Sequence, residues 1–327
     1  MGGMKMDNVT SKNEMVSPIT VLCLNPAVDV TYEVTRLIAD QKTYAMTTRY
    51  DPGGNGINVG RAFKQMGINA HTFCVIAGET GEFLQRMLAR QHDDVYYEFV
   101  DGETRINTTM LEQQTNTQYH VSGIGPTISP HHLERLLDVF VTLTGKGMAV
   151  ITGSLQQNIS VKLYAELSER IRQQGGRPVV DAPVAPLRHA IASKPFLIKA
   201  NLFELETLLG KSLESVDEIA AEARRIQQHG VDYVCVSMGG DGALLAGPDN
   251  TYLAAAPTIK ISATVGAGDS MVAGMTAVFS RNASAQEALR QGIACGTGTA
   301  RHPGTVLFST DDIVELAPQV VIRTLDR

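Results

Sequence analysis

Tryptophan is absent from the 327-residue sequence, and cysteine is scarce. The four cysteines are widely separated and lie mostly in apolar runs, so neither a CxxC metal site nor a disulfide framework is expected from Cys23, Cys74, Cys235 and Cys295. We therefore expect reduced cysteines in the core of a cytoplasmic protein.

Long apolar runs and basic blocks are missing as well. No run approaches the roughly 20 apolar residues that cross a bilayer, and residues 1–17 are polar, without the apolar stretch of a signal peptide. The net charge of −6 and the lack of a basic block argue against a nucleic-acid or membrane surface. We expect a small-molecule partner and a flexible N-terminal extension over residues 1–17.

Hydrophobic residues, in contrast, make up 43% of the chain, which is enough for a sizeable core. Short apolar runs typical of buried strands alternate with longer runs typical of helices along most of the sequence. This alternation predicts an α/β fold, with a doubly wound, mainly parallel sheet and helices on both faces. We expect residues 18–327 to form one domain.

Two segments of this domain have a different pattern of polar and apolar residues. Residues 30–51 and 95–122 alternate polar and apolar side chains and are rich in Thr, Tyr and Val, as in strands with one exposed face. We expect the two segments to pair into a small β-sheet. Such a sheet must cover something with its apolar face, so it would form a lid over a substrate or pair with a second subunit.

A glycine loop precedes an apolar helix near the C-terminus, at residues 262–270 (SATVGAGDS). The backbone amides of Gly266, Ala267 and Gly268 could surround an anion at the positive end of the helix dipole. Asp269 would be badly placed merely to hold a phosphate, because like charges repel. A base beside an anion hole suggests phosphoryl transfer; alternatively, Asp269 is only an N-cap.

Polar and glycine residues also follow several predicted strands. In open α/β sheets, ligands bind at the carboxyl ends of the strands. We therefore expect these positions to face one cleft; they are Asp29, Gly53, Gly54, Gly153, Ser154, Asp181, Asn201, Gly239 and Gly240.

Two longer motifs, in this order, resemble the signatures of the PfkB (ribokinase-like) family of sugar kinases. They are residues 53–62 (GGNGINVGRA) and 264–269 (TVGAGD), and the likeness covers nearly the whole chain from residue 19. The form of the second motif is similar to the hexose-phosphate branch, which includes the minor phosphofructokinase, fructose-1-phosphate kinase and tagatose-6-phosphate kinase. The resemblance implies a ribokinase-like fold with a small β-sheet lid.

The resemblance also implies roles for single residues. Asp269 matches the general base, and the amides from Gly266 to Gly268 match the anion hole. Sugar contacts are implied for Asp29, Gly53, Gly54, Asn58 and Ser154. Arg105 and Lys42, both expected in the small sheet, resemble residues that contact the phosphate of an acceptor already phosphorylated. The alternatives are that Asp29 caps a turn and that Asn58 is a solvated helix residue. Either Arg105 or Lys42 could also be an ordinary charged residue that protects a sheet edge.

On the nucleotide side, the resemblance implies ATP and Mg²⁺. Residues 199–204 (KANLFE) match a segment in which Asn201 reaches the phosphates and Glu204 acts through magnesium, with Lys199 beside them and Asp181 also near the metal. Ser237, Gly239 and Gly242 resemble a segment that borders the nucleotide; in isolation they would predict only a hairpin turn.

Some residues depart from the family pattern. Gln156, Gln157 and Asn158 replace a usual Pro-Pro-Gly, so acceptor specificity could have moved to this loop. Ala200 replaces a proline, and His302 stands where relatives often have Asn, which puts a K⁺ site in doubt. None of these changes removes the base, the anion hole or the Asn-x-x-Glu segment.

We therefore expect an ATP-dependent kinase that converts fructose 6-phosphate to fructose 1,6-bisphosphate, and a homodimer formed through the lid. Tagatose 6-phosphate, fructose 1-phosphate and an unphosphorylated sugar are alternative acceptors, and a catalytically silent sugar-phosphate-binding regulator is a more remote alternative. A Rossmann dehydrogenase is disfavoured, because the glycine loop at 53–56 lacks the G-x-G-x-x-G spacing after a first strand.

Overall fold

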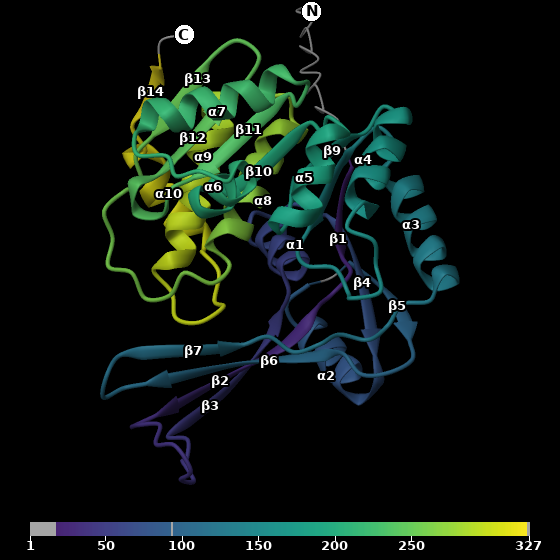
Figure 1. Ribbon diagram of the computed structural model, residues 1–327, viewed down its shortest axis with the longest axis vertical. Helices are drawn as coiled ribbons and strands as arrows, with labels where there is room; N and C mark the ends of the chain where they lie inside the picture. The colour runs from purple at the N-terminus through teal and green to yellow at the C-terminus, as the bar shows by residue number, and fades with distance from the viewer. Residues whose placement is uncertain (1–17, 93, 326–327) are drawn as a thin grey trace, which may run out of the picture.

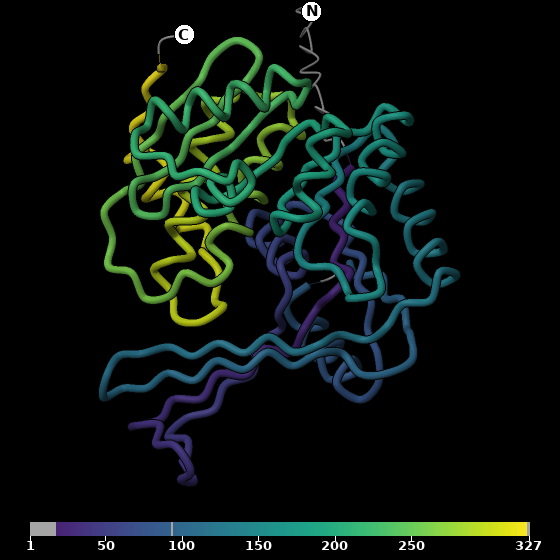
Figure 2. The backbone as a smooth tube through the Cα atoms, in the orientation of Figure 1, coloured from purple at the N-terminus to yellow at the C-terminus, as the bar shows by residue number. Residues whose placement is uncertain are grey.

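The computed structural model describes residues 18–92 and 94–325, so the extension expected over residues 1–17 lies outside the described residues. Two sheets of unequal size organise this part of the chain (Figure 1). The larger sheet, with helices packed on it, forms the body, and the smaller one projects from it (Figure 2). The α/β fold with a mainly parallel sheet and a small separate sheet is thereby confirmed.

The large sheet comprises ten strands within the described residues. Its central strands are parallel, and the strands beyond β11 pair antiparallel at one edge. In spatial order the strands are β14 (Ile322–Leu325), β13 (Thr251–Ala254), β12 (Ala243–Ala246), β11 (Tyr233–Ser237), β10 (Leu197–Asn201), β9 (Arg177–Asp181), β8 (Met148–Thr152), β1 (Ile19–Cys23), β4 (His71–Ala77) and β5 (Val95–Val100).

Helices cover both faces of this sheet. One face carries α3 (Pro130–Thr144), α4 (Leu163–Gln173), α5 (Val184–Ala192), α6 (Leu202–Leu209) and α7 (Val216–Gln228). The other carries α1 (Asn55–Gln65), α8 (Ala267–Ser280), α9 (Ala285–Ala300) and α10 (Thr310–Leu316), while α2 (Gly78–Leu88) packs with β2 and β4.

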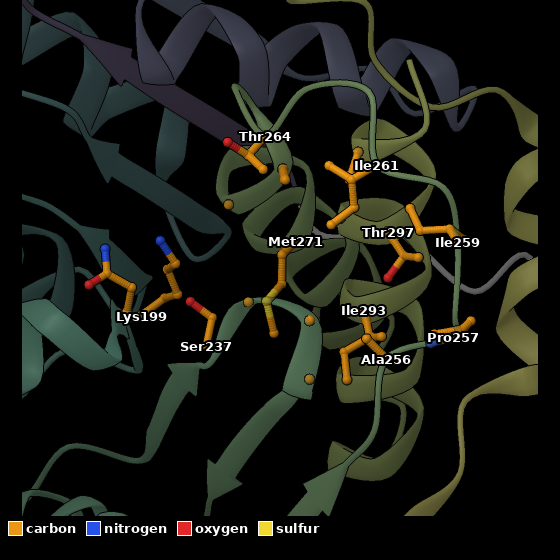
Figure 3. A pocket seen from close by; sticks show the side chains of 18 residues that line it. Lys199, Ser237, Ala256, Pro257, Ile259, Ile261, Thr264, Met271, Ile293 and Thr297 are labelled. Carbon is orange, nitrogen blue, oxygen red and sulfur yellow. The ribbon is translucent and has the colours of Figure 1, made fainter. Parts of the chain in front are cut away.

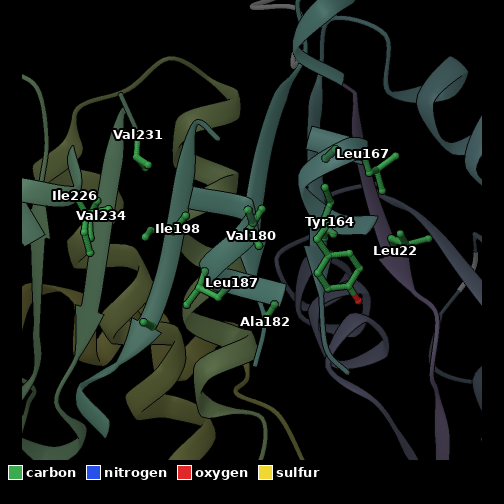
Figure 4. Packing of buried hydrophobic residues seen from close by; sticks show 14 of the residues in the cluster. Leu22, Tyr164, Leu167, Val180, Ala182, Leu187, Ile198, Ile226, Val231 and Val234 are labelled. Atoms are coloured by element: carbon green, nitrogen blue, oxygen red, sulfur yellow. The ribbon is translucent and has the colours of Figure 1, made fainter. Parts of the chain in front are cut away.

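The central strands are apolar throughout because both of their faces are buried. In β8, Ala149 and Ile151 pack into the cluster shared with α3 and α4, while Met148 and Val150 pack into the cluster shared with α8. Side chains alternate between the two faces of a strand, so a strand covered on both sides reads as an unbroken apolar run. Figure 4 shows Tyr164 of α4 packed near Leu22 of β1 in the first of these clusters.

The small sheet has the order β3-β2-β6-β7 and draws on two separate parts of the chain. Its strands are β2 (Ala27–Val34), β3 (Thr47–Gly53), β6 (Arg105–Glu112) and β7 (Thr117–Val121). The prediction that residues 95–100 belong to it is wrong, because β5 pairs in parallel with β4 at the edge of the large sheet. Residues 35–46 form a loop between β2 and β3 instead of continuing the strands.

No helix within 18–92 and 94–325 is long and apolar enough to cross a membrane.

Candidate functional site

Five neighbouring strands of the large sheet, β11, β10, β9, β8 and β1, end beside one another in parallel. Polar residues stand at or just after these ends. Asn201 is in register with Ser237, and Thr152, two residues before Ser154, is in register with Asp181. The sheet thereby brings together strand-end residues that lie far apart in the sequence.

Asp269 lies opposite these strand ends, in the first turn of α8. Gly266 precedes the helix with φ +79°, a backbone conformation that favours glycine. Asp269 makes no capping bond of its own, and only 5% of its surface is exposed. The N-cap alternative for this carboxylate therefore does not hold, because Gly266 occupies the cap position.

Two amides of α1 hold the carboxylate of Asp269. Asn55 Nδ2 donates to Oδ1 at 2.9 Å, and Asn58 Nδ2 donates to Oδ2 at 2.8 Å. Asn58 is buried, so it is not a solvated helix residue, and in this structure its amide faces Asp269. Asn55 did not emerge from the sequence as a site residue. Its spacing of three from Asn58, which places both on one helix face, was the available signal.

The surroundings of Asp269 raise the pKa of its carboxyl group. Burial, with the nearby Asp181 carboxylate, raises the pKa of Asp269 to about 6. The hydrogen bonds from Asn58 and Asn55 and the charge of Lys199 act in the opposite direction. A carboxyl with a pKa near neutrality can accept a proton and release it again at physiological pH.

Lys199 lies between the strand ends and the glycine loop. Its Nζ donates to Asp181 Oδ1 at 3.2 Å, and a Cβ added at Gly268 would lie 2.9 Å from the same nitrogen. Burial alone would lower the pKa of Lys199, but the carboxylates of Asp181, Glu204 and Asp269 together raise it. The side chain is therefore a buried cation against the start of α8.

Asn201 and Glu204 form a reciprocal capping box at the start of α6. Glu204 N donates to Asn201 Oδ1 and Asn201 N donates to Glu204 Oε2, both at 2.8 Å. Burial raises the pKa of Glu204, against the backbone hydrogen bond and Lys199. The box holds both side chains at the strand end, and it leaves Glu204 Oε1 and the Asn201 amide nitrogen out of its two hydrogen bonds.

Two cavities meet at this point. The first, of about 430 Å³, has Lys199 and Ser237 at one end and apolar residues such as Pro257, Ile259 and Ile293 at the other (Figure 3). Gly239 and Gly242, which turn the chain between β11 and β12, also line it.

The second cavity, of about 280 Å³, is bordered by Asn55, Ser154, Asp181, Glu204 and Asp269. The two cavities share three lining residues, Lys199, Asn201 and Gly268. An elongated ligand in the first cavity could thus present its charged end to Asp269.

The donors for a metal ion are few. Within the described part of the chain, no group of three or more His, Cys, Asp or Glu side chains could hold an ion. Asp181 Oδ2, however, is buried without a hydrogen-bond partner, and Asp181 and Glu204 border the same cavity. Two carboxylates with a free oxygen suit Mg²⁺ when phosphates and water supply the other ligands.

Asp29 lies at the base of the small sheet, outside the walls of both cavities. Its Oδ1 accepts from Asn107 Nδ2 at 2.7 Å, and a Cβ added at Gly53 would lie 2.3 Å from its carboxyl. Burial raises the pKa of Asp29, against this hydrogen bond and the charge of Arg105. Asp29 therefore binds a strand neighbour and does not cap a turn. Asn107 was missed, because only the pairing of β2 with β6 brings it there.

Gly54, also outside both cavity walls, is the N-cap of α1 at φ +111°. Side chains are strained there, so the glycine lets the chain turn from β3 into the helix that carries Asn55 and Asn58.

The two candidate phosphate ligands differ in their surroundings. Arg105 begins β6, and its guanidinium donates to the backbone carbonyls of Asn25 at 2.8 Å and Pro26 at 3.4 Å. Lys42 was expected in a strand, but it lies in the loop between β2 and β3, with Nζ 4.9 Å from the centre of the Tyr44 ring. The alternative that it protects a sheet edge fails for the same reason. Neither residue lines the two cavities.

His302, which bears on the expected K⁺ site, pairs with a carboxylate. Its Nε2 lies 2.8 Å from Asp312 Oδ2, and this interaction helps to lower the pKa of Asp312 to about 2, against burial, which acts to raise it. The imidazole is thus engaged with the capping box of α10.

Comparisons with known proteins agree with one another. The model of the pfkB family of carbohydrate kinases matches residues 20–312. The 1-phosphofructokinase of Bacillus subtilis is 33% identical over 310 residues, covering 94% of this chain and all of that protein. The ATP-dependent 6-phosphofructokinase isozyme 2 of Escherichia coli is 31% identical over 296 residues, covering 90% and 96%. The structure of E. coli phosphofructokinase-2 with fructose 6-phosphate superposes with a TM-score of 0.86 at 30% identity, over 93% of this chain and 99% of that one.

Proposed function

The chain belongs to the pfkB family of carbohydrate kinases, and from this premise we propose that it transfers the γ-phosphoryl group of ATP to a ketohexose phosphate. Fructose 6-phosphate is the first candidate, with fructose 1,6-bisphosphate as the product. The observation that carries the proposal is that the two cavities share part of their walls and that Asp269 borders the second, polar cavity.

In the proposed reaction, Asp269 takes the proton of the acceptor hydroxyl as that oxygen bonds to the γ-phosphorus. The bond between this phosphorus and the bridging oxygen breaks, and ADP leaves. The amides of Gly266, Ala267 and Gly268 stabilise the charge on the transferred group, and Lys199 supplies a buried cation beside them.

The nucleotide fits the first cavity, with its base at the apolar end and its phosphates near Lys199, Asn201 and Ser237. Asp181 and Glu204 would hold Mg²⁺ together with the phosphates. The ion would neutralise charge on the phosphate oxygens.

The acceptor would bind at the base of the small sheet, between Asp29 and Arg105. Contact with Asn58, whose amide donates to Asp269, would bring its hydroxyl close to the base. Asp29, Gly53, Gly54, Asn58 and Ser154 would contact the sugar, and Arg105 and Lys42 its phosphate. A guanidinium anchored by two carbonyls has donors left for a phosphate, which suits an acceptor that is already charged.

Fructose 1-phosphate is the second candidate acceptor. The 1-phosphofructokinases of B. subtilis and Borreliella burgdorferi are 33% and 29% identical to this chain, on either side of the 31% of the E. coli 6-phosphofructokinase. Phosphorylation of either monophosphate would yield the same bisphosphate.

The small sheet would also form the contact between two subunits. It exposes large apolar side chains along its strands and loops: Tyr44, Met46, Tyr50, Ile106, Tyr119 and Val121. Exposed apolar side chains in such number commonly mark an interface. Light scattering at micromolar concentration should give the mass of a homodimer, and a monomer mass would contradict this part of the proposal.

Potassium is a further candidate cofactor, because one structure of E. coli phosphofructokinase-2 is described as a complex with it. The engagement of His302 with Asp312 weakens the case for this chain. Equal rates in potassium and sodium buffers would exclude a requirement for potassium.

The test of the function is a coupled ADP-release assay with Mg-ATP. The panel comprises fructose 6-phosphate, fructose 1-phosphate, tagatose 6-phosphate and free hexoses, with Asp269→Asn alongside. We expect turnover on one phosphorylated ketose that is lost in the variant. Turnover only on a free hexose would contradict the proposed acceptor, and nucleotide binding without any turnover would favour the regulator.

A further inference from the structure

The connection from β1 to β2, residues 24–26, binds the guanidinium of Arg105. The guanidinium has two backbone acceptors in this connection, the carbonyls of Asn25 and Pro26. A shift of the connection would therefore carry the guanidinium with it. Whatever holds residues 24–26 also helps to hold the proposed phosphate ligand.

Gln156 also binds this connection. It belongs to the loop after β8, is only 4% exposed, and donates from Nε2 to the carbonyl oxygen of Leu24. Nearby, Asn25 Nδ2 donates to Ser154 Oγ at 3.2 Å. Two hydrogen bonds thus join the β8 loop to the segment on which Arg105 rests.

The same two amides carry buried oxygens without donors. Among the described residues, Gln156 Oε1 and Asn25 Oδ1 are both buried with no hydrogen-bond partner. The two side chains border the same glycine, since a Cβ added at Gly125 would be 2.3 Å from Asn25 Oδ1 and 3.8 Å from Gln156 Cγ. Buried acceptors are usually paired, so both amides are oriented here by their donor groups: Gln156 Nε2 bonds to the Leu24 carbonyl, and Asn25 Nδ2 bonds to Ser154 Oγ.

We propose that Gln156 is a positioning residue for recognition of the acceptor's phosphate, because it fixes the connection whose carbonyls orient Arg105. The inference rests on the proposed function, in which Arg105 binds that phosphate. The amide of Gln156 is what supplies the donor for the Leu24 carbonyl, and an apolar side chain at this position would have none.

Asn158 provides a matched control in the same loop. Its Nδ2 donates to the carbonyl of Ile128 at 2.7 Å, and its Oδ1 accepts from Ile128 N at 3.4 Å. These bonds anchor the loop to the segment before α3 and do not involve residues 24–26. Asn158→Leu therefore loses loop anchoring without loosening Arg105.

The experiment compares Gln156→Met, which keeps the side-chain length, with Asn158→Leu. We expect Gln156→Met to raise the KM for the sugar phosphate about fivefold to tenfold, the usual effect of one lost hydrogen bond. The KM for Mg-ATP and kcat should stay within about twofold. Asn158→Leu should leave all three parameters within about twofold. Equal KM values for the two variants would overturn the proposal.

A double mutant tests whether Gln156 acts through Arg105. In an Arg105→Gln background, Gln156→Met should change the sugar-phosphate KM by less than about twofold, since coupled residues are not additive. Full additivity would overturn the proposal, and Gln156→Leu repeats the series if the methionine variant does not fold. A wild-type enzyme inactive on every sugar phosphate would refute the proposed function itself, whereas an active enzyme with unchanged Gln156 variants would refute only this inference.

Discussion

The proposed transfer centre on the large sheet and the acceptor residues on the small sheet are built in different ways. Asp269 is buried, and amides of α1 and charges of β9 and β10 surround it. Lys42, in contrast, lies in an exposed loop, and the guanidinium of Arg105 is hydrogen-bonded to the connection between β1 and β2. The first region is held by the core, and the second by a few hydrogen bonds at the edge of the body.

This difference suggests a division of labour. Chemistry at a phosphoryl group needs fixed donors and a base in a water-poor site, which the ends of parallel strands and the start of a buried helix can provide. Choice of acceptor can be altered in loops that do not disturb the core. The contrast predicts that changes around Asp269 alter kcat, while changes at Arg105 and at the residues that support it alter KM for the sugar phosphate.

The largest effect is expected in the body. Asp269→Asn keeps the shape of the side chain and removes the base, so kcat should fall by about 10²- to 10⁴-fold. The KM for Mg-ATP should change little, because the nucleotide cavity is intact. The coupled ADP assay at saturating substrates measures this, and a loss below tenfold would mean that Asp269 is not the base.

On the small sheet, Arg105→Gln should raise the KM for a sugar phosphate by roughly 10- to 100-fold, the range for a lost charge-assisted hydrogen bond. Slow turnover of the corresponding free sugar, measured at high concentration, serves as the control and should not change. Equal weakening of both acceptors would identify Arg105 as a structural anchor of residues 24–26 only.

The buried charge of the body predicts a pH-dependent stability. The raised pKa of Asp269 means that its ionisation destabilises the fold, and the penalty grows as pH rises from 3.8 towards about 6. The stability of Asp269→Asn relative to wild type should therefore increase by about 1 to 2 kcal/mol between pH 5 and pH 8. Urea unfolding at both pH values measures the change; a constant difference would mean that the carboxylate is better solvated than its burial indicates.

The smallest effect is expected at the exposed loop. Lys42→Met should raise the KM for the sugar phosphate only about twofold to fivefold, and added salt should weaken the wild type towards the variant. A rise above about tenfold would show that Lys42 is enclosed during turnover. A second subunit docked on the small sheet would enclose Lys42 in this way.

Much of the fold could be predicted because a strand buried on both faces has an unbroken apolar sequence. The apolar strands and the glycine loops between them indicated a parallel sheet with a cleft at its carboxyl ends. The failure at residues 95–100 has a physical cause: β5 is the edge strand of the large sheet, and an edge strand is half exposed, as a strand of a small sheet is. Periodicity alone does not distinguish them.

The candidate site was predicted in part for a related reason. Asp269 and the glycines before it lie in one short motif, whereas its contact with Asn55 joins residues 214 positions apart. The links from Arg105 to Asn25 and from Asp29 to Asn107 likewise depend on how β2 pairs. Side-chain partners that meet only through tertiary pairing leave no local signal.

The most direct test of this division of labour measures binding and transfer separately in Asp269→Asn and Arg105→Gln. Calorimetry gives the Kd of the sugar phosphate, and rapid-quench single turnover at saturating acceptor gives the transfer rate. We expect Asp269→Asn to bind with nearly wild-type Kd and to transfer at least about 100-fold more slowly. Arg105→Gln should bind at least about tenfold more weakly and transfer within a few-fold of wild type once saturated. If both variants changed the same parameter, the separation of chemistry from recognition would be contradicted.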